Sequence, residues 1–164
     1  MNDEQAMTPT ETDGAVSSPH DPRDAARPGL PAGRTQAKEQ QGPIVVDAID
    51  ETVLAMAHRV VDLASDKKAS DIILLDVRAQ TTMTDYFVIC SGASDRQLSA
   101  IADGIIAGLR DDGIEALSRE GEASSHWLLV DFGGVIVHVM SKPEREFYQL
   151  EKLWEDASLL VHVV

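Results

Sequence analysis

The stretch WLLVDFGGVIVHVM, residues 127–140, decides the fold of this chain. Two runs of strand-forming residues, 127–132 and 135–140, flank the pair Gly133-Gly134, and this spacing predicts a β-hairpin with a two-residue turn. The predicted register places three apolar pairs on one face: Phe132 with Val135, Val130 with Val137, and Leu128 with Val139. Because every side chain on that face is apolar, we expect the face to belong to the core.

The opposite face of the hairpin is mixed in character and carries Trp127, Leu129, Asp131, Ile136, His138 and Met140. His138 and Asp131 lie diagonally on it, so one hypothesis is an ion pair that raises the pKa of His138 and makes it a base. A cross-strand polar contact that satisfies a half-buried histidine is the favoured hypothesis, because no serine or cysteine nucleophile is placed beside the pair.

Before the hairpin, the sequence predicts a helix and two buried strands. Apolar residues recur at helical spacing over about 46–65, which is typical of an amphipathic helix. Residues 71–77 (DIILLDV) and 85–91 (DYFVICS) are apolar runs without clean alternation. Strands of that kind lie inside a sheet that is covered on both faces.

Capping signals predict two further helices. Ser94-x-x-Gln97 begins one that Gly113 ends, and a short third strand is predicted over 114–118. Ser141-x-x-Glu144 begins the last helix, whose apolar side carries Phe147, Leu150, Leu153 and Trp154. The predicted fold is therefore a mixed α+β domain, with a mixed sheet of four or five strands and helices on its faces.

Composition divides the chain into segments. Residues 1–43 hold six of the seven prolines, no aromatic residue and a net charge of −3. Such a segment cannot bury enough apolar surface to offset its ordering entropy, so we expect a disordered extension. Residues 44–156 form the predicted domain, and the apolar residues 157–164 have no predicted state.

Charge and cysteine content limit the function classes. The net charge of −14 argues against a protein that grips nucleic acid through its phosphates. No apolar run approaches the roughly 20 residues that span a bilayer, and the acidic start Met1-Asn2-Asp3-Glu4 does not resemble a secretory signal. The single cysteine, Cys90, lies in an apolar run and is expected to be a buried packing residue of a cytoplasmic protein.

Catalytic and metal-binding patterns are missing. The turn Ser91-Gly92-Ala93-Ser94 follows a strand and precedes a helix, as in a phosphate-binding loop or a nucleotidyltransferase. The lysine of a P-loop is missing, and so is a pair of carboxylates at i and i+2 on one strand, which two-metal chemistry needs. A tight turn with a capped helix is the favoured interpretation, and we expect no catalytic residue, metal or cofactor.

The remaining features are typical of a protein-binding surface. Trp127 follows a polar loop and is either core or an interface residue of the kind that contributes most of the binding energy. Glu120-Gly121-Glu122, in that loop, offers carboxylates to a basic partner. Basic and aromatic residues are too scattered for a nucleic-acid stacking platform. From the residues alone, the protein is expected to bind another protein.

Five segments, in this order, resemble one known family. They are 71–77 (DIILLDV), 84–92 (TDYFVICSG), Glu120-Gly121 with Trp127 six residues after that glycine, 135–140 (VIVHVM) and 148–154 (YQLEKLW). The ordered set resembles the ribosomal silencing factor family, RsfS, also called Iojap-related. The resemblance covers roughly residues 46–155.

The resemblance implies a nucleotidyltransferase-like fold that has lost catalysis. It implies binding to the large ribosomal subunit at universal large-subunit protein fourteen, exclusion of the small subunit under nutrient limitation, and a homodimer. Trp127 matches the family's tryptophan near the ribosomal protein, and Glu120, Gly121 and Glu122 match the loop before it. Tyr148 and Lys152 match positions on the last helix, which are either further ribosome contacts or packing residues. Two alternatives stay open: an adaptor for large-subunit assembly or maturation, and an active nucleotidyltransferase.

Overall fold

A computed structural model describes residues 44–164; the disorder expected for residues 1–43 lies outside the described residues. In chain order, the elements are α1 (Ile44–Asp66), β1 (Ser70–Asp76), β2 (Tyr86–Gly92), α2 (Asp95–Asp111), β3 (Ser118–Glu120), the short 3-10 helix η1 (Ala123–Ser125), β4 (Trp127–Asp131), β5 (Val135–Ser141), α3 (Lys142–Tyr148), α4 (Leu150–Leu153) and β6 (Ser158–Val163). Over this part of the chain, no helix has both the length and the apolar character needed to cross a bilayer.

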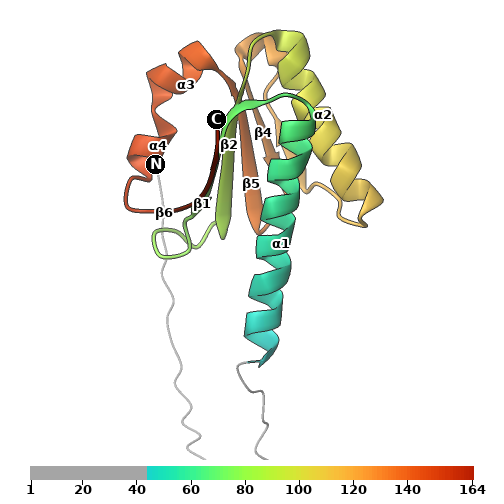
Figure 1. Ribbon diagram of the computed structural model, residues 1–164, viewed down its shortest axis with the longest axis vertical. Coiled ribbons are helices and arrows are strands. Elements are labelled where there is room, and N and C mark those ends of the chain that lie inside the picture. Colours follow the sequence, from blue (N-terminus) through green and yellow to red (C-terminus); the bar gives the residue numbers. More distant parts are fainter. Residues whose placement is uncertain (1–43) are drawn as a thin grey trace, which may run out of the picture. The chain divides into compact units, whose positions relative to one another are not determined.

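The strands form one mixed sheet in the order β3-β4-β5-β2-β1-β6. β2 and β5 run parallel, and the other neighbours are antiparallel. α1 and α2 lie on one side of the sheet, and α3 and α4 lie on the other (Figure 1). The predicted α+β class is confirmed. The predicted number of four or five strands is wrong, because residues 158–163 add a sixth strand at the edge beside β1.

The larger core lies between the sheet and the helices α1 and α2. The hairpin contributes to it in the predicted register, with Leu128 opposite Val139, Val130 opposite Val137, and the Phe132 N–H donating to the Val135 carbonyl. Cys90 is fully buried in this core, as predicted, and burial raises the pKa of its thiol to about 12. The thiol is therefore protonated at neutral pH and serves as a packing group.

The mixed face of the hairpin is buried along β5 and half-buried along β4. Ile136 and Met140 form a second, smaller core with Phe87 and other residues of β1 and β2. Leu150 and Trp154, from the segment that holds α4, pack against this core. The sheet is therefore covered on both faces, as the unbroken apolar runs of β1 and β2 predicted.

The helix caps follow the predicted signals. The Ser94 hydroxyl accepts from the N–H of Gln97 at the start of α2, and Ser141 caps α3 in the same way through the N–H of Glu144. Gly113 follows α2 with a φ of 85°, a conformation that glycine adopts without strain.

The predicted third strand exists, but its bounds are wrong: it spans Ser118–Glu120 and not 114–118. Ile114 and Ala116 are partly buried against the larger core from a connecting segment, so their alternation reflects packing and not sheet pairing. The pairing begins where the N–H of Leu117 donates to the Asp131 carbonyl, 2.8 Å away. β3 then follows as three exposed residues against β4.

The apolar side predicted for the last helix is also only partly correct. The helix is interrupted at Gln149, whose φ of 48° is left-handed, and this divides it into α3 and α4. Leu150 and Trp154 face the second core, but Phe147 and Leu153 are 80% and 73% exposed. The break changes which side chains face the sheet, so a single helical periodicity does not describe the segment.

Candidate functional site

Four of the six candidate residues meet in one groove. Its volume is about 370 Å³, and it is lined by Glu120, Gly121, Ser125, Trp127, Leu129 and Tyr148. These residues come from β3, the loop after it, β4 and the end of α3. The ring centroids of Trp127 and Tyr148 lie 4.8 Å apart with their planes tilted by 51°. Trp127 is half-buried and Tyr148 is 48% exposed, so both rings pack together and face solvent.

The loop between β3 and β4 fixes the start of the Trp127 strand. Gly121 has a φ of 83°, and a Cβ there would lie 2.3 Å from the carbonyl oxygen of Trp127. At the other end of the loop, His126 also has a positive φ, and its Nδ1 lies 2.8 Å from a carboxylate oxygen of Asp95 on α2. The loop is therefore held closely against both β4 and α2.

Glu120 and Glu122 occupy different places in this loop. Glu120 is exposed, lines the groove and pairs with Leu129 across the β3–β4 ladder. The Glu122 carboxylate instead accepts from the Ser124 hydroxyl at 3.3 Å, and its backbone carbonyl accepts from the Ser125 hydroxyl at 2.7 Å. Glu122 therefore stabilises η1 beside the groove and is not among the residues that line it.

A buried histidine holds the Trp127 indole. The indole Nε1–H donates to Nδ1 of His138 over 3.2 Å, and the ring of Phe87 meets that of His138 edge-on at 5.2 Å. The hypothesis that Asp131 pairs with His138 is wrong, because Asp131 accepts from the N–H of Gly133 in the hairpin turn, 2.7 Å away. The favoured hypothesis, a cross-strand contact that satisfies His138, is correct in kind, but the partner is Trp127.

The environment of His138 makes folding pH-dependent. The side chain is 7% exposed, and burial lowers its pKa to about 4. The neutral ring accepts at Nδ1 and therefore carries its proton on Nε2. In the unfolded chain, the same group has a pKa near 6.5. As the pH falls from about 6.5 to 4, the unfolded state therefore binds more protons than the folded state, and the free energy of unfolding decreases.

We therefore expect the free energy of unfolding to fall by about 2 kcal/mol between pH 7 and pH 4.5 on account of His138. Urea unfolding at a series of pH values measures this loss. His138→Gln keeps an acceptor for the indole and removes the titration, so its stability should depend less on pH over this range. Equal slopes for the two proteins would show that other groups cause the loss.

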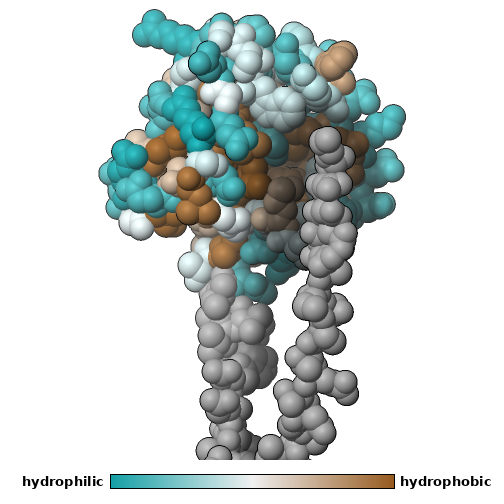
Figure 2. Space-filling model, turned by 180° about the vertical axis from the view of Figure 1, so that it is seen from behind, coloured by the Kyte–Doolittle hydropathy of each residue, from teal (hydrophilic) through white to brown (hydrophobic). Residues whose placement is uncertain are grey.

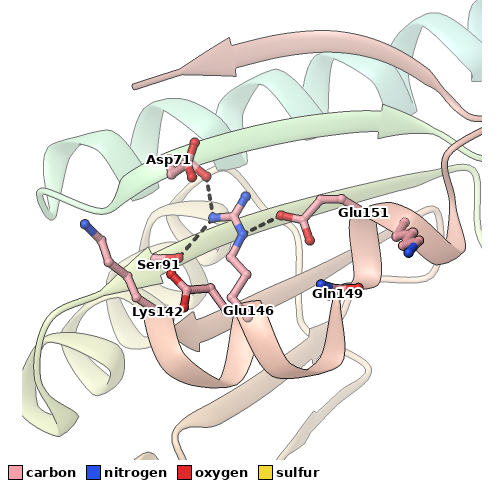
Figure 3. A pocket seen from close by; sticks show the side chains of 8 residues that line it. Asp71, Ser91, Lys142, Glu146, Gln149 and Glu151 are labelled. Carbon is pink, nitrogen blue, oxygen red and sulfur yellow. Dashed lines mark hydrogen bonds and ion pairs between the residues drawn. The ribbon is translucent and has the colours of Figure 1, made fainter.

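Lys152 lies apart from the groove. It lines a different cavity, of about 500 Å³, together with Asp71, Ser91, Lys142, Arg145, Glu146, Gln149 and Glu151 (Figure 3). This cavity shares no lining residue with the groove at Trp127. Lys152 is therefore not part of that groove.

Arg145 connects the elements around this second cavity, a role that the sequence analysis missed. Its Nη1 donates to the Asp71 carbonyl at 2.6 Å and to the Ser91 hydroxyl at 3.0 Å, and its Nε donates to Glu151 at 2.5 Å. Asp71 has a left-handed φ of 53°, which a non-glycine residue rarely adopts. Arg145 thus fixes α3 and α4, and with them Tyr148, against β1 and β2.

The turn after β2 is built as a tight connection and a helix cap. The Ser91 hydroxyl accepts a hydrogen bond from Arg145, and the Ser94 side chain caps the start of α2. A Cβ on Gly92 would lie 2.8 Å from a methyl group of Leu98, so packing accounts for this glycine. Among the side chains that the structure describes, those of residues 50–164, no three from His, Cys, Asp or Glu are arranged to hold a metal ion.

Comparison with known proteins gives consistent results. A family model described as "Ribosomal silencing factor during starvation" matches residues 50–163. The ribosomal silencing factor RsfS of Bacillus subtilis is 44% identical over 109 residues, which cover 66% of this chain and 90% of that protein. A mouse protein named "Mitochondrial assembly of ribosomal large subunit protein 1" is 38% identical over 98 residues, which cover 58% of this chain and 43% of the relative.

A solved structure agrees with the fold. The crystal structure of a Chromobacterium violaceum protein superposes with a TM-score of 0.61 at 32% identity, over 66% of this chain and 92% of that one. The family model covers more than half of the chain and includes every strand of the sheet. The chain therefore belongs to the ribosomal silencing factor (RsfS) family.

Proposed function

We propose that this protein represses translation in the cytoplasm when nutrients are limiting. It binds the large ribosomal subunit and, by occupying the surface that meets the small subunit, prevents the two from associating. Membership of a family described by silencing during starvation supports this function. The proposal assigns no catalytic step to the chain; magnesium-dependent binding of a nucleoside triphosphate, measured by calorimetry, would contradict that part of it.

The docking surface in this proposal is the groove at Trp127, and its partner is a basic ribosomal protein, universal large-subunit protein fourteen. The main support for this surface is the pair of partly exposed rings, Trp127 and Tyr148, which line the groove together with Glu120. Large aromatic side chains in a recess dominate the binding energy of many interfaces. Residues 44–164 carry a net charge of −11, which repels RNA and steers the domain towards a basic protein.

Trp127→Ala is expected to weaken binding to isolated large subunits by at least about 30-fold, corresponding to about 2 kcal/mol. Co-sedimentation over a series of protein concentrations measures the change. Tyr148→Ala should weaken binding as well, and it removes a side chain that is more exposed than Trp127. Leu117→Ala, an exposed substitution outside the groove, is the matched control and should bind as the unchanged protein does.

Unchanged binding by both groove variants would contradict the docking surface. The near-UV circular dichroism and melting temperature of Trp127→Ala must stay close to those of the unchanged protein, because Trp127 also packs against the second core. If only Trp127→Ala loses binding and its spectrum changes too, the ring acts through folding and not through contact.

The second candidate function is an adaptor for assembly of the large subunit. The name of the mouse relative, which refers to large-subunit assembly, favours it. A joining assay with purified mature subunits separates the two functions. Silencing requires that added protein lowers the yield of joined ribosomes. An unchanged yield, together with binding to precursor subunits, would favour assembly.

The proposal also includes a homodimer, as the family resemblance implies. Sedimentation velocity of the full chain over a range of concentrations tests it directly. A single species with the mass of one chain at all concentrations would contradict this part of the proposal and leave ribosome binding unaffected.

A further inference from the structure

The two edges of the sheet differ in length and in charge. At one edge, β3 has three residues, all exposed, and includes Arg119 and Glu120. Short and charged edge strands resist pairing with another chain. At the other edge, β6 has six residues (SLLVHV) with no proline and no Asp, Glu, Lys or Arg. Within residues 44–164, its outer side has no strand partner, so it lacks these protections.

Apolar side chains are exposed along β6. Leu159 and Leu160 are 56% and 43% exposed. The register against β1 shifts at this point: Leu75 is opposite Leu159 and Leu74 is opposite Val161, which leaves Leu160 without a partner on β1. Hydrophobic surface is also visible between hydrophilic regions on the face of the molecule drawn in Figure 2. An unpaired edge with exposed leucines favours the addition of a further strand.

A groove of about 320 Å³ runs beside β6 on the α4 side of the sheet. Its apolar lining comes from β1, β6 and the segment between α4 and β6: Ile73, Leu75, Trp154, Ala157 and Leu159. A strand added to β6 would point every second side chain towards this side of the sheet. The groove therefore offers those side chains apolar contacts in addition to the backbone hydrogen bonds.

Charge indicates which kind of segment fits this edge. The two basic side chains that line the groove already have carboxylate partners. Arg145 lies 2.5 Å from Glu151, and His162 lies 2.8 Å from Asp71. Glu155 and Asp156, directly before β6, are exposed and form no ion pair with another described residue. The edge therefore has uncompensated negative charge, which disfavours a second copy of this acidic chain and favours a basic guest.

We propose that the outer edge of β6 binds an extended, basic segment of a partner protein, which joins the sheet as an additional strand. Apolar side chains of the segment lie in the groove beside Leu159, and its lysines or arginines approach Glu155 and Asp156. Residues 1–43 of the chain itself do not fit this role. Of their longer stretches without proline, residues 1–8 and 10–18 are acidic, and residues 32–42 have alanine as their only apolar residue type. The site goes beyond the proposed function, since β6 and the β3–β4 groove lie at opposite ends of the sheet.

The test uses the full chain and a fluorescein-labelled synthetic peptide in which valine and lysine alternate over about nine residues, enough to span β6. Anisotropy at an ionic strength of about 0.15 M measures its affinity. Leu160→Lys should weaken binding at least about tenfold, by placing a positive charge on the edge. Leu117→Lys makes the same charge change at another exposed leucine and should alter the affinity less than about twofold. Bound peptide should also slow amide hydrogen exchange over residues 158–163.

Several outcomes would overturn the proposal. Equal weakening by both lysine variants would show attraction by overall charge alone, and no binding of the peptide would exclude this class of guest. Equal affinity for a peptide with proline at its centre would exclude strand addition. Another such outcome is a dimer in sedimentation velocity that Leu160→Lys dissociates and Leu117→Lys does not. That result would mean that the edge binds a second copy of this chain and not a basic partner. Tyr148→Ala, which tests the groove at Trp127 but removes an exposed ring outside the second core, should leave peptide binding unchanged. Failure of the β6 site is therefore distinguishable from failure of the groove at Trp127.

Discussion

Arg145→Leu is expected to lower the free energy of unfolding by about 3 kcal/mol. The guanidinium is almost fully buried and donates to three groups on three elements: the Asp71 carbonyl, the Ser91 hydroxyl and the Glu151 carboxylate. Leucine keeps much of the side-chain volume and supplies no donor. Two of the acceptors are neutral groups in partly or fully buried contacts, and leaving such groups unpaired costs about 1–3 kcal/mol each. Urea unfolding at neutral pH measures the loss.

Arg119→Leu is the matched control. Its ion pair with Asp103 joins two side chains that are 38% and 62% exposed, and exposed pairs contribute less than about 1 kcal/mol. Arg145→Lys should fall between the two, because an ammonium group cannot reach all three acceptors as a guanidinium does. A loss for Arg145→Leu no larger than that for Arg119→Leu would show that its three contacts do not hold the elements together.

The hairpin was predictable because local signals agree there. Two glycines between strand-forming runs fix both the turn and the register, and the register makes one face wholly apolar. The capping boxes at Ser94 and Ser141 were predictable for the same reason: a hydroxyl and the N–H three residues later are near in sequence.

The partner of His138 was not predictable from the register. Leu129 lies directly opposite His138, so Trp127 and Asp131 are both diagonal neighbours, two residues to either side of Leu129. The register alone therefore does not decide which of the two side chains contacts His138. The hydrogen bond from Gly133 engages Asp131 in the turn, and the indole of Trp127 then supplies the donor.

The elements near the C-terminal end depend on contacts between distant residues. No local signal marks Gln149 as the break between α3 and α4, and Arg145 finds acceptors on β1 and β2, which precede it by 74 and 54 residues. Residues 158–163 form a strand because β1 has a free side there, a fact that only the assembled sheet reveals. For the groove, the loop residues and Trp127 were indicated by the sequence, and Tyr148 was implied by the family resemblance. Neither source separated these residues from Glu122 and Lys152, which do not line the groove.

Gly121→Ala is expected to lower the free energy of unfolding by about 3 kcal/mol and to weaken large-subunit binding together with it. A left-handed backbone costs a residue with a Cβ about 1–2 kcal/mol. The new methyl group would also lie 2.3 Å from the Trp127 carbonyl oxygen, so the start of β4 must move. Moving packed backbone costs a further 1–3 kcal/mol or so. The shift displaces Trp127 from its contacts with Tyr148 and His138.

Gly113→Ala separates these two causes. Gly113 has a φ of 85°, close to the 83° of Gly121, but a Cβ there meets no atom within 4 Å. The control should therefore lose only about 1–2 kcal/mol and bind large subunits normally. The difference between the two variants measures the cost of crowding Trp127, and the indole N–H resonance of Trp127 should shift only in Gly121→Ala. Equal losses, with normal binding by both, would show that the backbone conformation alone matters and that the loop does not set the position of Trp127.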